Sequence, residues 1–78
     1  MEKILIGLEH SVDHAVVNRI STLIADLRSG DEVIITLESA EEQETEPVKQ
    51  VLAEHGFKVQ EQGQKEGKTY ILAQRMYH

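Results

Sequence analysis

The sequence predicts a single α+β domain, a two-layer βαβαββ sandwich with two helices on one face of a mixed four-stranded sheet. Two short apolar runs, residues 3–8 and 33–37, are each followed by a helical segment. Two extended segments joined by a glycine-containing connection then follow, which is typical of a hairpin. The 78 residues, 40% of them hydrophobic and 28% charged, suit one globular domain over residues 1–78.

The first half of the chain reads as strand, helix, strand. Residues 3–8 are too few for a helix and are rich in Ile and Leu, so they predict a strand. Ser11 can cap a helix of about four turns over residues 12–27, where apolar residues recur at helical spacing. Gly30 suits the left-handed position at its end. Because a full helix separates the two strands, residues 33–37 are expected to run parallel to the first strand.

An acidic segment precedes the second helix. Five glutamates lie within residues 38–46, and Ser39 with Glu42 matches a capping box for a short helical turn. Pro47 is expected to interrupt that turn, since proline is tolerated mainly in the first turn of a helix. The main helix is therefore predicted to begin near Glu46, and the acidic segment to be a solvated surface.

The C-terminal third predicts a helix end and a hairpin. His55 closes the apolar stripe of the second helix as a half-buried residue, and Gly56 ends the helix. Residues 57–62 are mostly polar, so they are expected at a sheet edge. Residues 63–67 read as a five-residue hairpin loop, and residues 68–76 as a strand inside the sheet.

Composition excludes several classes of function. The net charge is −6, with 14 acidic and 8 basic residues, so we expect neither nucleic-acid nor anionic-membrane binding. The chain has no cysteine, and hence no disulfide, thiolate nucleophile or cysteine metal site. No stretch reaches the ~20 apolar residues of a membrane span. The first ten residues turn acidic too soon for a signal peptide, which predicts a cytoplasmic location.

The element order, the turn at Gly30 and Asp31, and the Ser-Ala-Glu-Glu…Glu-Pro stretch over residues 39–47 together resemble the TusA/SirA-like sulfur-carrier family. Pro47 falls where that family begins its second helix with a proline. The resemblance implies strand order 1-2-4-3, with the fourth strand antiparallel to the rest. A ferredoxin-like arrangement is the alternative, disfavoured because a helical segment rather than a hairpin follows the second strand.

The chain departs from this family at its reactive position. The family's Cys-Pro-x-Pro motif falls at about Asp13-His14-Ala15-Val16, where neither Cys nor Pro is present. A persulfide needs a polarisable thiolate, so transfer of sulfur through that cysteine is excluded. We therefore expect a non-enzymatic interaction or regulatory module, with no catalytic residue and no cofactor.

The alternative function is metal or small-ligand binding at the junction before the first helix. His10 and His14 are four residues apart, and Asp13 can add a carboxylate, which suits Zn²⁺ or Ni²⁺ if a helix begins by His10. A cap at Ser11 would instead leave His10 outside the helix. The competing interpretation is a polar helix cap with solvated histidines.

A possible interaction surface lies on the sheet face away from the helices. Alternation along the strands turns Leu5 and Ile34 to that face, together with one of Ile71 or Tyr70, of which we take Ile71. Nothing else in so short a chain is available to cover these side chains. They predict docking of a protein partner, or a weak homodimer, through the open sheet face.

Overall fold

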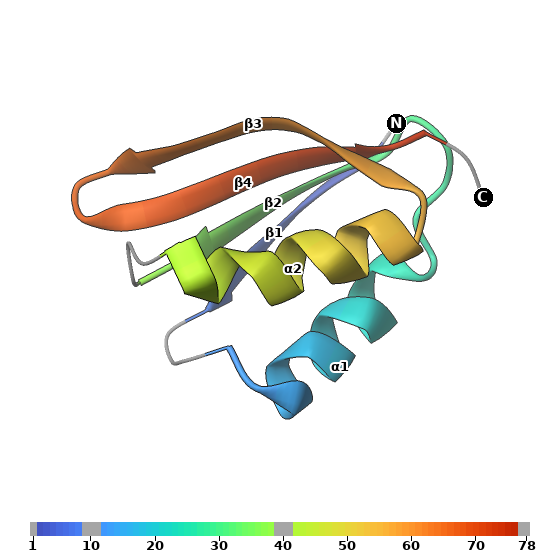
Figure 1. The fold of residues 1–78 in the computed structure, drawn as a ribbon. Coiled ribbons are helices and arrows are strands. Elements are labelled where there is room, and N and C mark those ends of the chain that lie inside the picture. Colours follow the sequence, from blue (N-terminus) through green and yellow to red (C-terminus); the bar gives the residue numbers. More distant parts are fainter. Residues whose placement is uncertain (1, 9–11, 39–41, 77–78) are drawn as a thin grey trace.

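The computed structural model describes residues 2–8, 12–38 and 42–76. Its elements, in chain order, are β1 (Lys3–Leu8), α1 (His14–Ile24), β2 (Glu32–Leu37), α2 (Glu42–Glu54), β3 (Phe57–Lys65) and β4 (Lys68–Arg75). The sheet has the order β1-β2-β4-β3, with β1 parallel to β2 and β4 antiparallel to both of its neighbours. Both helices cover the same face of the sheet (Figure 1). The predicted α+β class and strand order are thus confirmed, and the ferredoxin-like alternative is not observed.

Helix α1 is shorter than the predicted 12–27. Its N-cap is Asp13, whose carboxylate accepts a hydrogen bond from the Val16 N–H at 3.0 Å. The prediction of Ser11 as the cap is therefore wrong, and Ser11 itself lies outside the described residues. The helix ends at Ile24, and Gly30, with φ of 91°, supplies a left-handed turn only later, in the loop before β2.

Helix α2 begins at Glu42, earlier than predicted, and contains Pro47 in its interior. Proline donates no backbone hydrogen bond to the preceding turn, which costs helical stability. The face beyond it buries Val48, Val51 and Leu52 against the sheet. Burial of three aliphatic side chains contributes several kcal/mol, roughly 1.5–3 each, and this outweighs the local cost.

The β3–β4 hairpin is tighter than the predicted five-residue loop. Two residues, Glu66 and Gly67, form the turn with φ of 54° and 78°. Positive φ at both central positions is the geometry of a type I′ turn, whose twist matches that of paired strands. Strand β3 therefore extends to Lys65, and its expected place at the sheet edge is confirmed.

The core lies between the sheet and the two helices, where strand residues alternate between the covered and the open face. Val33, Ile35 and Leu37 of β2 are buried as predicted. Ile71 has 0% exposure and lies opposite Ile35, so its predicted place on the open face is wrong. Because the centre of β4 is a continuous apolar run, its sequence does not indicate which alternate residues face the helices. The neighbouring residue Leu72 faces away from the helices instead.

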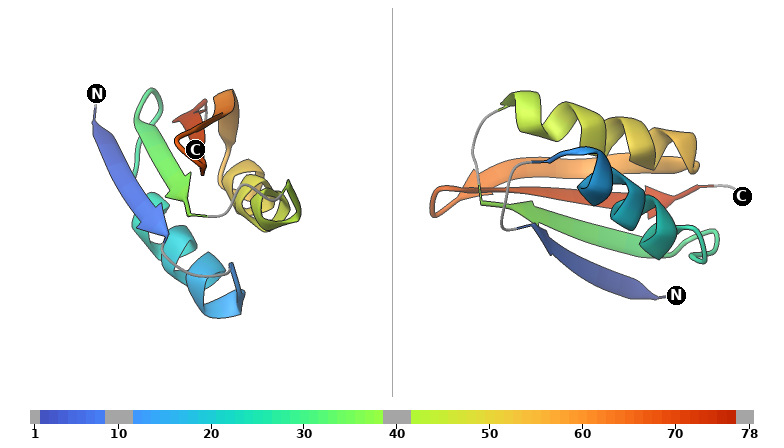
Figure 2. Two further views of the ribbon diagram at one scale, coloured as in Figure 1. Left: turned by 90° about the vertical axis from the view of Figure 1, so that its left-hand side faces the viewer. Right: turned by 90° about the horizontal axis from the view of Figure 1, so that it is seen from below.

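The views in Figure 2 show how the two helices divide the covered face. Helix α1 lies on the β1 side of the sheet, and α2 lies on the β3 side. In the described ranges, neither helix has the length and apolar character that spanning a membrane requires. The opposite face of the sheet is left without a second layer by the described residues (Figure 2).

Candidate functional site

The open sheet face carries one apolar row that crosses three strands. The strand registers place Leu5 beside Ile34, Ile34 beside Leu72, and Leu72 beside Glu61. Leu5 is 70% exposed, and Ile34 and Leu72 are half-buried. The row therefore runs from the outer edge of β1 to a charged residue on β3. Two of its members, Leu5 and Ile34, were predicted from the sequence, and Leu72 takes the place of Ile71.

Polar and small residues border this row on both sides. The flanking rows, read from the same registers, are Lys3, Glu32, Gln74 and Lys58 on one side and Gly7, Thr36, Tyr70 and Gly63 on the other. A Cβ atom at Gly63 would lie 2.8 Å from the Tyr70 hydroxyl oxygen and 3.0 Å from its Cζ. The Tyr70 ring thus lies across the backbone of β3. A narrow apolar strip with a polar rim is typical of an interaction surface.

At the junction before α1, Asp13 serves as the helix cap. Asp13 is exposed, and its carboxylate is engaged by the Val16 N–H. His14 is the first residue of α1 and is exposed, whereas His10 lies outside the described residues. Over residues 2–8, 12–38 and 42–76, no group of three or more His, Asp or Glu side chains is placed to hold a metal ion. The predicted site at His10, Asp13 and His14 therefore depends on a residue that the structure does not describe, and it stays a prediction.

A shallow hollow of about 210 Å³ lies beside this junction. Its lining comprises Val12, Asp13, His14, Val17 and Pro47. The Val12 N–H, which precedes the helix, donates to the Glu44 carboxylate of α2 at 2.8 Å. Because an internal carboxylate occupies this donor, and the Asp13 carboxylate occupies that of Val16, an incoming anion would meet negative charge here. The hollow is poorly suited to phosphate or carboxylate ligands.

The acidic segment is only in part the solvated surface that was predicted. Glu38 pairs with Lys68 at 3.3 Å, and Glu46 pairs with Lys49 at 3.4 Å. Such exposed pairs contribute little to stability, roughly 0–1 kcal/mol each. Glu44 is half-buried and ties α2 to the segment that leads into α1. Its role is therefore internal, unlike that of the paired surface glutamates.

His55 links the two helices. It is half-buried at the end of α2, as predicted, and its Nε2 lies 2.8 Å from the Ser21 Oγ of α1. A hydroxyl and a neutral imidazole can exchange donor and acceptor roles in such a bond. Sequence reasoning did not anticipate Ser21 as the partner, because the two residues are 34 positions apart.

Arg75 was not predicted from the sequence pattern, and its role is structural. It is 9% exposed, and its Nη1 donates to the carbonyls of Ala25 at 3.2 Å and Leu27 at 2.6 Å. Its guanidinium carbon also lies 5.7 Å from the centre of the Phe57 ring. These bonds satisfy the carbonyl of Ala25, the C-cap of α1, and that of Leu27 in the loop that follows the helix. The buried cation is thus used within the fold.

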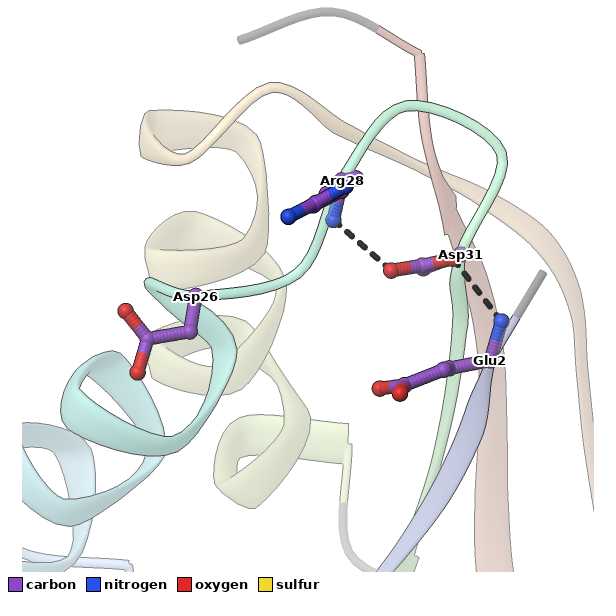
Figure 3. Close-up of a pocket in the computed structure, with 4 residues that line it drawn as sticks. All are labelled: Glu2, Asp26, Arg28 and Asp31. Atoms are coloured by element: carbon purple, nitrogen blue, oxygen red, sulfur yellow. Dashed lines mark hydrogen bonds between the residues drawn. The ribbon is translucent and has the colours of Figure 1, made fainter.

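A cavity of about 370 Å³ lies between the start of β1 and the α1–β2 loop, lined by Glu2, Asp26, Arg28 and Asp31. Asp31 accepts hydrogen bonds from the backbone N–H groups of Glu2 and Arg28, each at 2.8 Å (Figure 3). These two bonds, the Glu2 bond first, lower the pKa of Asp31 from its usual value. The Asp26 carboxylate points away from Asp31 in Figure 3. The charged groups therefore do not converge on a common ligand position.

Comparison of the chain with family models, with curated proteins and with solved structures found no match. The open face is accordingly assessed on its geometry alone. On this face, the predicted interaction residues Leu5 and Ile34 lie side by side on neighbouring strands. At the junction before α1 and at the other cavity, the carboxylates of Asp13, Glu44 and Asp31 bond backbone N–H groups of the chain itself.

Proposed function

We propose that this chain is a non-enzymatic interaction module, a cytoplasmic protein with a sulfur-carrier-like fold that lacks the persulfide cysteine. In this proposal it docks a protein partner through the apolar row of Leu5, Ile34 and Leu72. The observation that carries the proposal is that this row runs across three strands on the face opposite the helices. Its strip of aliphatic side chains, bordered by polar rows, suits a partner with a complementary apolar ridge.

The internal use of polar side chains supports a docking role. Asp13 caps α1, His55 bonds Ser21, and Asp31 holds two backbone N–H groups. General acid–base catalysis requires a titratable group that can reach a substrate proton. Asp13, Asp31 and His55 are each engaged with the protein itself. In this proposal the apolar row on the open sheet face supplies the recognition chemistry.

Site-specific photo-crosslinking tests this proposal. A photo-reactive phenylalanine analogue at Leu72, at the β4 end of the row, should give a discrete adduct with a protein from the source organism. Ala53 provides the matched control, because it is exposed on α2 in the opposite layer. The adduct should also disappear when Ile34 is changed to Lys, since a charge beside Leu72 would be buried by the partner. Equal adducts from positions 72 and 53, or adducts that survive Ile34→Lys, would contradict docking through the row.

A further inference from the structure

Strand β1 has a free outer edge whose hydrogen-bonding groups can be assigned. The Glu32 N–H donates to the Glu2 carbonyl at 2.8 Å, and the Glu38 N–H donates to the Leu8 carbonyl at 3.2 Å. In a parallel pair, alternate residues direct both backbone groups to the same neighbour. The even-numbered residues of β1 therefore face β2. The odd-numbered residues, Lys3, Leu5 and Gly7, direct three N–H and three C=O groups to the outer edge, where no described strand pairs with them.

These three residues are symmetric about Leu5, which makes the edge complementary to itself. We propose that a second copy of this chain pairs its β1 antiparallel to this β1, with the two-fold axis at Leu5. Leu5 then faces the Leu5 of the second copy, and Lys3 faces Gly7 in both halves of the pair. All three are hydrogen-bonded positions, so each copy satisfies its six outward groups in one register. The result is a continuous eight-stranded sheet with all four helices on one face.

The side chains in this register are compatible with close pairing. Directly opposite side chains in an antiparallel pair lie about 4.5–5.5 Å apart at Cβ, and like charges placed there destabilise the pair. Each Lys3 lies opposite Gly7, which has no side chain and leaves room for the lysine stem. The central pair is Leu5 with Leu5, the most exposed large apolar residue of the described chain. Pairing therefore covers the residue that is most costly to leave in water.

A second exposed aliphatic residue lies on the same side of the molecule. Ser21 marks the flank of α1 that faces α2, because it bonds His55, and the buried Ile20 and Ile24 mark the flank that faces the sheet. At about 100° per residue, Leu23 falls on the flank opposite Ser21. Leu23 is 45% exposed, and α1 lies on the β1 side of the sheet (Figure 2). Antiparallel pairing of β1 therefore brings the Leu23 flank of α1 in one copy toward the same flank in the second copy, across the two-fold axis.

The other edge of the sheet is protected against the same pairing. Strand β3 carries a register irregularity between Val59 and Glu61, and bulges of this kind disturb the regular spacing of edge groups. It also exposes Lys58, Glu61 and Lys65 along its length. Strand β1 has an uninterrupted register with β2 over all of its residues. The second copy is therefore expected at β1 and not at β3.

A charge-swap experiment at the two-fold axis tests the register. Leu5→Arg and Leu5→Glu each place two like charges opposite each other, so each variant alone should associate at least about tenfold more weakly than the parent chain. An equimolar mixture of the two should form a heterodimer, because the charges are then opposite. Sedimentation equilibrium and native mass spectrometry distinguish the masses, and circular dichroism confirms that both variants fold.

A monomeric parent chain at high micromolar concentration would overturn the proposal, and so would a Leu5→Arg variant that dimerises as well as the parent. A Leu72→Lys variant separates this edge from the docking face proposed above. It should keep the dimer, because Leu72 lies on a central strand, while it weakens docking of another protein. Loss of the dimer in Leu72→Lys would indicate face-to-face stacking and would overturn pairing through β1. The edge proposal does not rest on the proposed docking function.

Discussion

The Asp31 carboxylate joins the start of β1 to the loop that follows α1. It is 7% exposed, and its two oxygens hold the backbone at Glu2, before β1, and at Arg28, in the loop after α1. Both bonds favour the ionised form, which is why the pKa of Asp31 lies below its usual value. The loop and the first strand are thus joined by a charge-assisted contact that neither segment makes by itself.

The lowered pKa of Asp31 predicts a pH-dependent stability. A carboxylate with a lower pKa in the folded state stabilises the fold fully above its unfolded pKa, near 3.8, and this contribution is lost as pH falls through the folded pKa. Asp31→Asn should therefore lower the urea midpoint at neutral pH, and its difference from the parent should shrink below about pH 4. Asp26→Asn, at an exposed position of the same cavity, should leave the midpoint unchanged at both pH values. A constant difference across pH would show that charge is not the source.

Arg75 provides a second test at a single residue. Arg75→Met removes the donor to the Ala25 and Leu27 carbonyls while it keeps much of the aliphatic volume. Leaving buried acceptors without a donor costs roughly 1–3 kcal/mol, so the free energy of unfolding should fall by about that amount. Arg28→Met, at an exposed arginine, should change it by less than about 0.5 kcal/mol. Equal effects of the two substitutions would contradict the capping role of Arg75.

At the scale of elements, α2 shows a local rule overruled by packing. Pro47 predicts an interruption, yet the helix continues from Glu42 to Glu54 because its far half is anchored in the core. Proline removes one backbone hydrogen bond and adds one unfavourable ring contact, whereas burial of Val48, Val51 and Leu52 packs the helix against the sheet. Helix α1 was predicted too long because the apolar spacing continues past its end. The helix ends at Ile24, and Leu27 is buried from the loop that follows, without helical geometry.

The hairpin turn predicts opposite effects at its two positions. Both Glu66 and Gly67 have positive φ, which glycine and asparagine adopt more readily than glutamate. Glu66→Asn should raise the free energy of unfolding by about 0.5–1 kcal/mol, and Gly67→Ala should lower it by roughly 1–2 kcal/mol. A Cβ at Gly67 would meet no atom within 4 Å, so the second effect reports backbone conformation alone. Thermal unfolding of both variants measures this, and a neutral Gly67→Ala would contradict the assigned turn.

At the scale of the whole molecule, the strand order decides which amides of β1 are protected. Because β1 is an edge strand with its even residues facing β2, hydrogen exchange at low protein concentration should alternate along it. The amides of Ile4 and Ile6 should exchange slowly, and those of Leu5 and Gly7 should exchange fast. As concentration rises and the β1 edges pair, Leu5 and Gly7 should become protected as well. Uniform exchange along β1 at low concentration would contradict the assigned directions.

The candidate surface was predicted in part. Leu5 and Ile34 lie within segments with clear alternation, so their direction followed from the β1–β2 pattern. In β4, residues 70–73 are all apolar or aromatic, and the flanking polar residues Thr69 and Gln74 have opposite parity, so neither indicates which parity faces the core. Ile71 was therefore assigned to the wrong face, whereas Tyr70, the alternative to it, lies on the open face. The antiparallel register with β2, which no local pattern encodes, places Leu72 in the row.

The sequence alone determined the element order, the class of the fold and the edge position of β3, because hydrophobic periodicity and glycine positions act over a few neighbouring residues. It also determined that the chain has no thiolate chemistry, since composition needs no geometry. Only the tertiary structure decided that Arg75 caps α1, that Asp31 joins β1 to a distant loop, and that Leu72 completes the apolar row. These contacts join residues far apart in the chain, and only the packing of the sheet against its helices brings them within reach.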